Sequence, residues 1–440
     1  MYALIAIVFV LGYLAIAFEH RIKVDKAASA LLTAVLTWTL LVLGVDASAS
    51  HDVRHHLGEI AEILFFLLGA MTIVELVDAH EGFRVITDRI RSRNKVTLLW
   101  ILGFITFFLS AVLDNLTTTI VMVSLLRKLV GDARERWLFA GIVVIAANAG
   151  GAWTPIGDVT TTMLWIGGQI TAVQIMKQLF LPSLVCLLVP ILLLSFRLKG
   201  DVQVIAVAGD AVDNRDVVTT FERNLVFALG IGALLFVPVF KTITHLPPYM
   251  GILFGLSVLW IVTEVMHGSK NAEEKRPLSI AGVLTRVDST SILFFLGILL
   301  AVSALASSGQ LAQVGELLST HLGNIYAINL AIGLLSAIID NVPLVAGAMK
   351  MYPLVTPGEL AAAGDASTWL GQFVVDGPFW ELLAYCAGTG GSCLIIGSAA
   401  GVAAMGMEKI DFFWYLKHIS LLALLGYLAG AFIYIAMAMI

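Results

Sequence analysis

Charged residues are scarce in this sequence. Asp, Glu, Lys and Arg make up 13% of its 440 residues, about half of the share that is usual in soluble proteins. Apolar residues make up 59%, more than a soluble globule hides, which argues against a soluble enzyme. Lys and Arg number 26 against 31 Asp and Glu, a net charge of −5, so the chain lacks the basic surface of a nucleic-acid-binding protein.

Cysteine is nearly absent. The chain has three, Cys186, Cys386 and Cys393, all in apolar stretches and none in a CxxC pair, which favours buried apolar side chains over a disulfide framework or a thiolate metal site. No basic residue precedes the apolar run at 2–18. Although residues 15–17 (AIA) resemble a signal-peptidase site, we therefore predict a retained first membrane span.

What the chain has in abundance is long apolar runs. A span needs about 20 apolar residues, and together the runs predict an all-α polytopic membrane protein. Runs 96–130 and 324–349 carry a polar cluster at their centre, and runs 138–166 and 379–405 are interrupted by glycines. The remaining runs lie at 2–18, 28–45, 60–77, 172–196, 222–241, 248–266, 290–306 and 419–440.

The two halves of the chain repeat. Residues 109–115 (LSAVLDN) match 335–341 (LSAIIDN), and residues 63–67 match 292–296, both reading ILFFL. The glycines at 150, 151 and 157 match those at 390, 391 and 397. Ordered matches at nearly one offset predict an internal duplication, with residues 1–197 and 222–440 as the two repeats and 198–221 as a cytoplasmic linker.

Each half contains an odd number of crossings if its polar-centred run is a re-entrant hairpin, so the second half is predicted to be inverted. With both termini outside, 22 of the 26 Lys and Arg residues fall in cytoplasmic segments, as the positive-inside rule requires. This supports about ten transmembrane helices, hairpins at 96–130 and 324–349, and broken helices at 138–166 and 379–405. The basic residues left outside are Arg54, Lys177, Lys241 and Lys350.

Three aspartates, Asp114, Asp158 and Asp340, lie inside or between apolar runs. Carboxylates at membrane depth are costly and usually mark an ion or proton pathway. Asparagine and threonine side chains surround them in the sequence, and unwound backbone at the glycine breaks adds free carbonyl groups. Such oxygen donors suit Na⁺ or Li⁺, since hard cations prefer oxygen ligands, and broken helices in matching positions of two halves point to a transporter's site.

Simpler roles are open for some polar residues. Each hairpin aspartate can instead cap a half-helix, most of all Asp340, which Asn341 and Pro343 follow. Glu381 lies near a span end, which favours an interfacial side chain. The histidines in loops and at span edges, including His80, are expected to be solvated.

Two stretches, SAVLDNLTTTIVM (110–122) and ANAGGAWTPIGDVTTTM (147–163), resemble the NhaD-type sodium/proton antiporters. This family belongs to the ion transporter superfamily, together with arsenite exporters and sodium-coupled dicarboxylate carriers. The resemblance implies a homodimer with scaffold and transport regions and elevator-like movement. The dicarboxylate carriers have Ser-Asn-Thr at their hairpin tips. Here the tips read DNL (114–116) and DNV (340–342), and the added negative charge disfavours an anionic substrate.

The resemblance also assigns site residues. Together with Asp340, the repeat mate of Asp114, the predicted ion-binding positions are Asp114, Asn115, Asn148, Asp158, Thr160, Thr161, Ser336 and Asn341. Supporting positions are predicted at Thr117, Thr118, Gly150, Gly151, Thr154, Gly390, Gly391 and Ser392. Asp158 is the predicted primary ligand and proton carrier.

The sequence therefore predicts a secondary Na⁺(Li⁺)/H⁺ antiporter rather than an enzyme. It would export sodium for protons in pH homeostasis, from the bacterial cytoplasmic membrane, with no cofactor. An arsenite or dicarboxylate carrier on the same fold is the nearest alternative, and a channel is another. An intramembrane aspartyl protease is disfavoured, because its Gly-x-Gly-Asp element is replaced by PIGD at residues 155–158.

Overall fold

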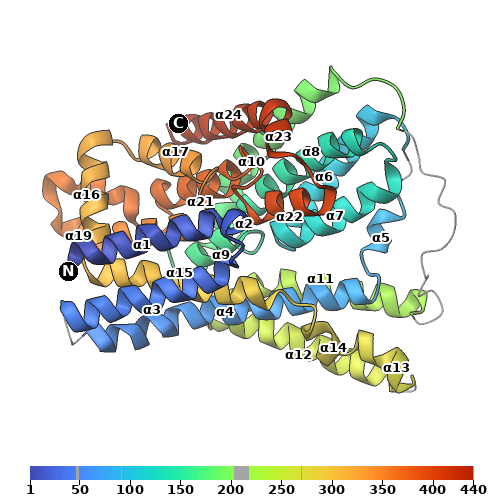
Figure 1. Cartoon of the computed structure of the whole chain (residues 1–440), viewed down its shortest axis with the longest axis horizontal. Coiled ribbons are helices and arrows are strands. Elements are labelled where there is room, and N and C mark those ends of the chain that lie inside the picture. Colours follow the sequence, from blue (N-terminus) through green and yellow to red (C-terminus); the bar gives the residue numbers. More distant parts are fainter. Residues whose placement is uncertain (46–48, 91, 203–217, 269, 440) are drawn as a thin grey trace.

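The computed structural model describes residues 1–45, 49–90, 92–202, 218–268 and 270–439 (Figure 1). In this part of the chain, every regular secondary-structure element is a helix. The first half contains α1 Tyr2–Ala17, α2 Glu19–Ile22, α3 Lys26–Gly44, α4 Ser50–Ala79, α5 Arg84–Thr87, α6 Lys95–Ser110, α7 Asn115–Leu129, α8 Ala133–Ala152, α9 Val159–Ile166 and α10 Ala172–Ser195.

The second half contains α11 Thr220–Thr244, α12 Pro248–Met266, α13 Ala272–Lys275, α14 Ile280–Leu284, α15 Ser289–Ser307, α16 Gln310–Leu322, α17 Ile325–Leu335, α18 Asn341–Met351, α19 Pro357–Ala362, α20 Ser367–Leu370, α21 Pro378–Gly390, α22 Ala399–Glu408, α23 Phe412–His418 and α24 Ser420–Ala438. Most of the predicted linker at 198–221 lies outside the described residues.

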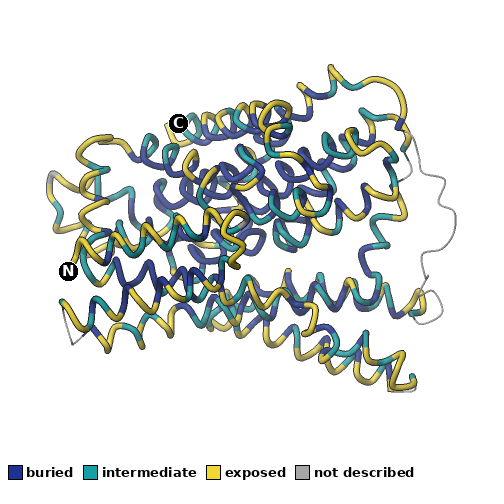
Figure 2. The backbone as a smooth tube through the Cα atoms, viewed as in Figure 1, coloured by how far each residue is buried: buried dark blue, intermediate teal, exposed yellow. Residues whose placement is uncertain are grey.

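Seven described helices are long and apolar enough to span a membrane: α3, α4, α10, α11, α12, α15 and α24. They coincide with predicted runs, and α1 is a shorter apolar helix of 16 residues. Large apolar side chains on these helices stay exposed, among them Leu43 and Val265, and the outer helices in Figure 2 carry many exposed positions. Such surfaces suit lipid. The prediction of an all-α polytopic membrane protein is confirmed.

Helices break where the sequence places its polar and glycine clusters. α6 and α7 are separated by residues 111–114, and α17 and α18 by residues 336–340; α8 and α9 are separated by 153–158, and α21 and α22 by 391–398. The residue at the end of each break accepts a hydrogen bond from a backbone N–H of the next helix. These caps, Asp114, Asp158, Asp340 and Ser398, satisfy amides that the break exposes.

Both halves also share a close backbone approach. A Cβ atom on Gly150 would meet the Phe107 carbonyl, and one on Gly390 would meet the Gly333 carbonyl. In each half, a glycine before the break of one helix thus lies against the helix that leads into the hairpin. The contacts join equivalent positions of the predicted repeats, and they support the duplication. The inverted relation of the halves stays a prediction.

The helices lie in two layers in Figure 1. We call α3, α4, α11, α12 and α15 the first layer, in which α3 packs on α15 and α12 on α4. The second layer contains α6, α7, α8, α10, α22 and α24, with α10 on α24 and α6 on α8. α18 contacts α15, and α9 contacts α4, so the broken helices meet the first layer.

Glu408 joins three parts of the second layer. Its carboxylate accepts hydrogen bonds from Arg127 Nε at 2.7 Å and from Arg136 Nε at 2.8 Å, and its backbone carbonyl accepts one from Trp137 Nε1. Arg127 also donates to the Met407 carbonyl. The end of α22 is thereby fastened to the end of α7 and the start of α8.

Two predictions for single side chains were wrong, and several described helices lie outside the predicted runs. Glu381 is buried rather than interfacial, and it accepts a hydrogen bond from Tyr434 at 2.7 Å. His80 is buried rather than solvated, because tertiary packing covers the end of α4. The longest described helix outside the predicted runs is α16, with 13 residues, which meets α17 at a bend of 118°.

His80 stacks on His267, with ring centroids 5.0 Å apart and an interplanar angle of 12°. Both residues directly follow spanning helices, α4 and α12. Their Nε2 atoms are buried and have no hydrogen-bond partner among the described residues. Burial lowers the pKa of His80 and lowers that of His267 to about 4, with the neighbouring His80 adding to the shift at His267.

Candidate functional site

Asp158 lies at the centre of the site, at the end of the break between α8 and α9. Its side chain is 1% exposed. Oδ1 accepts hydrogen bonds from the backbone N–H and the hydroxyl of Thr160, both at 2.8 Å. These bonds cap α9 and fix the carboxylate's direction. The position follows from local sequence, because glycines and Pro155 end α8 and an aspartate begins α9 well.

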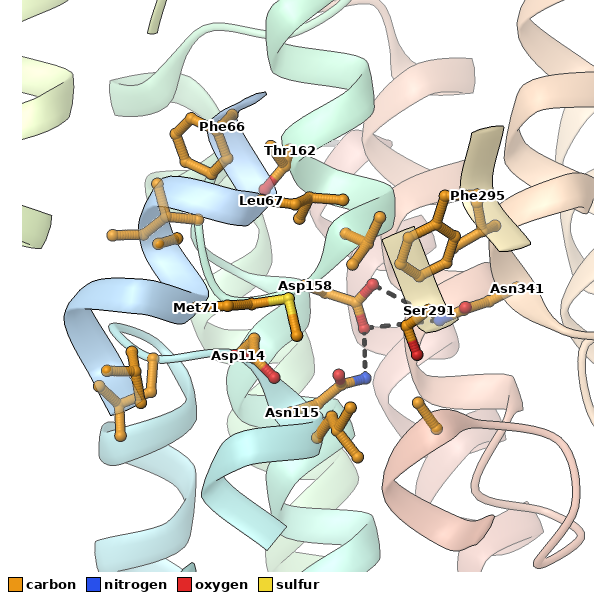
Figure 3. Close-up of a pocket in the computed structure, with 18 of the residues that line it drawn as sticks. Phe66, Leu67, Met71, Asp114, Asn115, Asp158, Thr162, Ser291, Phe295 and Asn341 are labelled. Atoms are coloured by element: carbon orange, nitrogen blue, oxygen red, sulfur yellow. Dashed lines mark hydrogen bonds between the residues drawn. The ribbon is translucent and has the colours of Figure 1, made fainter. Parts of the chain in front are cut away.

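Asn115, at the tip of the first hairpin, connects Asp158 to Asn148 in α8, on the other side of the helix break. Its Nδ2 donates to Asp158 Oδ2 at 2.7 Å (Figure 3) and to Asn148 Oδ1 at 2.9 Å. Asn148 Nδ2 in turn donates to Ser392 Oγ at 2.8 Å and to Ser398 Oγ at 2.9 Å. A buried network of this kind orients each member through the next one, and here it runs from the hairpin tip into the second half.

The second half reaches the carboxylate directly as well. Asn341, the repeat mate of Asn115, begins α18 and places Nδ2 3.5 Å from both carboxylate oxygens of Asp158 (Figure 3). Hairpin tips 226 residues apart thus meet at one carboxylate. The structure therefore brings together five of the predicted ion-binding residues: Asp158, Thr160, Asn115, Asn148 and Asn341.

Asp114 and Asp340 each have two roles, as a helix cap and as a lining residue of the cavity. Asp114 accepts from the Thr117 backbone N–H at 2.8 Å and from the Thr117 hydroxyl at 2.7 Å, and Asp340 accepts from the Val342 N–H at 3.1 Å. Each therefore caps its half-helix, which was the simpler of the two interpretations. Each also lines the cavity that contains Asp158, so capping and a contribution to the site's charge coexist.

Other predicted positions support the backbone around the site. Ser336 Oγ donates to the Ala387 carbonyl at 2.8 Å, and Thr161 donates to the Asp158 carbonyl at 2.9 Å, so both hydroxyls hold backbone. Thr154 fastens the break to the Ala111 carbonyl. Thr118 is buried, and its hydroxyl has no partner among the described residues.

The four glycines of the supporting set lie where there is no room for a side chain. A Cβ atom at any of these positions would meet neighbouring backbone within 3 Å. This close approach packs the broken helices against the hairpins and against their own continuation. The positions are Gly150, Gly151, Gly390 and Gly391.

A cavity of about 70 Å³ lies beside Asp158. Its wall is mainly apolar on the side of α4 and α15, where Phe66, Met71 and Phe295 face it (Figure 3). Its charged lining residues are Lys26, Asp114, Asp158 and Asp340. A small, mostly apolar cavity with several carboxylates at one end can hold a small cation and suits neither a bulky nor an anionic ligand.

Three neighbours of the site were not among the residues predicted from the sequence. Ser398 Oγ accepts a hydrogen bond from Asn148. Its position as the repeat mate of Asp158 could have identified it from the sequence. Ser110 donates to the Ala147 carbonyl at 2.6 Å, which matches the bond of its own repeat mate, Ser336. Lys26 gave no such signal, because its place in the cavity depends on how the layers pack.

Residues 13–371 match a family model described as "Citrate transporter". "Sodium/proton antiporter 1" from Arabidopsis thaliana is 52% identical over 437 residues, which cover 98% of this chain and 72% of that protein. "Sodium/proton antiporter 2" from the same plant is 48% identical over 440 residues, with 98% of both chains covered.

"Na(+)/H(+) antiporter NhaD" from Vibrio cholerae is 32% identical over 460 residues, which cover 96% of this chain and 89% of that protein. All three similarities include both hairpins and both broken helices. The chain therefore belongs to the family of membrane transporters that the citrate transporter model describes, together with these plant and NhaD-type antiporters.

Proposed function

We propose that this protein exchanges Na⁺ or Li⁺ for protons across a membrane, with both ions competing for the carboxylate of Asp158. The observation that carries the proposal is the burial of this carboxylate between the amides of two hairpin tips, beside a cavity lined by two further carboxylates. The names of relatives 52% and 32% identical to the chain support it.

The chemistry of the exchange follows from this arrangement. A cation in the cavity beside Asp158 would find the carboxylates of Asp114 and Asp340 and the amide of Asn115 among the groups that line it. Burial makes a lone negative charge costly, so the carboxylate holds either a metal cation or a proton. If the site crosses the membrane only when its charge is neutralised, cation and proton move in opposite directions and net exchange results.

The proposal extends to how the site moves. The second layer, together with α9, α18 and the side chains bonded around Asp158, would slide as one body against α4 and α15, whose wall of the cavity is largely apolar. The proposal also includes inverted halves, with both termini outside. It further includes a homodimeric state and a location in the bacterial cytoplasmic membrane. Sodium export for pH homeostasis is the expected physiological role.

The description of the family model makes an anionic substrate the alternative. The charged groups that line the cavity are three carboxylates and one ammonium group. A di- or tricarboxylate would face net repulsion there, whereas a monovalent cation would be attracted. This balance favours the cation, and transport of citrate or arsenite is an outcome that the experiment below can reveal.

The experiment uses everted vesicles that carry a preset pH gradient, followed with a gradient-sensitive dye. We expect Na⁺ or Li⁺ to collapse the gradient between pH 7 and 9.5, and Asp158→Asn to abolish the response. Asp411→Asn is the matched control, since Asp411 is an exposed cap of α23 and neither it nor its partner Trp414 lines the cavity. A wild-type protein that ignores Na⁺ and Li⁺ but transports citrate or arsenite would overturn the proposal.

A further inference from the structure

Lys26 begins α3, and its side chain lines the same cavity as the three aspartates. Among the described residues that line this cavity, it is the only cation. Its Nζ lies 4.6 Å from the centre of the Phe294 ring, and Phe294 is fully buried in α15. A cation–π contact of this kind stabilises the ammonium group and limits where it can go.

The lysine and the aspartates belong to different parts of the fold. Lys26 and Phe294 are carried by α3 and α15, which pack on each other in the first layer. The aspartates lie at the breaks before α7, α9 and α18. A charge fixed to one layer therefore faces an anionic site fixed to the hairpins and broken helices.

We propose that Lys26 is a fixed countercharge that sets how tightly the site binds Na⁺ and protons. This inference rests on the proposed function. The ammonium group repels an arriving cation and favours the ionised aspartates, so it weakens the binding of both exchanged ions. It also attracts the unloaded, anionic site toward the first layer, and binding of Na⁺ or protons cancels that attraction. Lys26 is thus a positioning residue that ties occupancy to movement.

Removing the charge should tighten binding rather than weaken it. For a unit charge at a separation on the order of 10 Å and an effective dielectric constant of about 20 to 40, Coulomb's law gives a change in cation affinity of about four- to seventeenfold. Lys26→Gln should therefore lower the apparent KM for Na⁺ by about that factor and shift the pH profile of exchange toward alkaline pH by about one unit. A mere packing defect would raise KM instead.

Three variants separate charge from structure. Lys26→Arg keeps the charge and should keep KM near the wild-type value. Phe294→Leu keeps the lysine but frees its ammonium group, so it should shift KM in the same direction as Lys26→Gln and by less. Arg21→Gln removes an exposed charge from the neighbouring helix α2, outside the cavity, and should leave KM unchanged.

The experiment measures the Na⁺ concentration that gives half-maximal thermal stabilisation of the purified full-length protein, alongside KM in proteoliposomes. We expect both to fall in Lys26→Gln. An unchanged or raised value in Lys26→Gln, or an equal fall in Arg21→Gln, would overturn the role of Lys26. A wild-type protein that Na⁺ neither stabilises nor drives would overturn the proposed function itself, and the inference with it.

Discussion

Glu408→Gln tests whether the second layer is held as one body. The substitution keeps the size of the side chain and removes the negative charge that two guanidinium groups share. Arg127 and Arg136 then face a neutral amide at 2.7 and 2.8 Å, and α22 loses its charged link to α7 and α8. We expect a less stable protein whose site residues are unchanged.

The magnitude depends on how far each partner is shielded from water. Breaking a fully buried charge pair costs about 3–5 kcal/mol. The Glu408 side chain is 1% exposed and that of Arg136 17%, but that of Arg127 is 48% exposed, and water will solvate much of its charge. We therefore expect a loss of about 2–3 kcal/mol, a fall in melting temperature of about 2–5 °C for a chain of this length.

The assay is thermal unfolding of purified protein in detergent, with Arg127→Gln and Arg136→Gln measured beside Glu408→Gln. Arg127→Gln should lower the melting temperature least of the three, because Arg136 still pairs with Glu408. If Glu408→Gln melts like the wild type, or if Arg127→Gln is the most destabilising of the three, Glu408 does not hold α22 to α7 and α8 in this way.

Three further predictions concern the site and its surroundings. Asn115→Ala removes a hydrogen bond to the carboxylate of Asp158 worth about 1.5–3 kcal/mol, so Na⁺/H⁺ exchange in vesicles should fall about tenfold or more; wild-type exchange would contradict the network. Gly150→Ala should lower folded yield and melting temperature because backbone blocks its Cβ, whereas Gly232→Ala, with open space around it, should not. The pKa of His267 is lowered in the folded state, so protonation of this ring destabilises the fold. This loss of stability is absent above about pH 6.5 and grows as pH falls toward 4. His267→Gln should therefore lose less melting temperature than the wild type between pH 7.5 and 5, and an equal loss would count against the burial of this ring.

The breaks in the helices were predictable because their causes are local. Glycine and proline end α8, and Asp114, Asp158 and Asp340 cap the next helices through bonds that span two or three residues. The meeting of Asn115 with Asn341 at Asp158 also had a sequence signal, since the repeat identifies the two asparagines as equivalent.

Features that depend on packing between distant helices were not predictable. Nothing near Lys26 in the sequence indicates that α15 will offer it an aromatic ring and a shared cavity. His80 was predicted to be a solvated histidine, but it is buried and its ring packs on that of His267 at the end of α12. Ser336 and Thr161 have the residue types of ligands, yet their hydroxyls bond backbone carbonyls, because helix geometry decides which way each side chain points.

The central claim is that Na⁺ and a proton compete for the carboxylate of Asp158. The most direct test is proton release on addition of Na⁺ to weakly buffered, purified protein, followed with a pH indicator near the midpoint of the exchange profile. We predict release that saturates with Na⁺ and scales with protein concentration in the wild type and in Asp411→Asn, and none in Asp158→Asn. Equal release from Asp158→Asn, or Na⁺ binding without proton release in the wild type, would contradict the account.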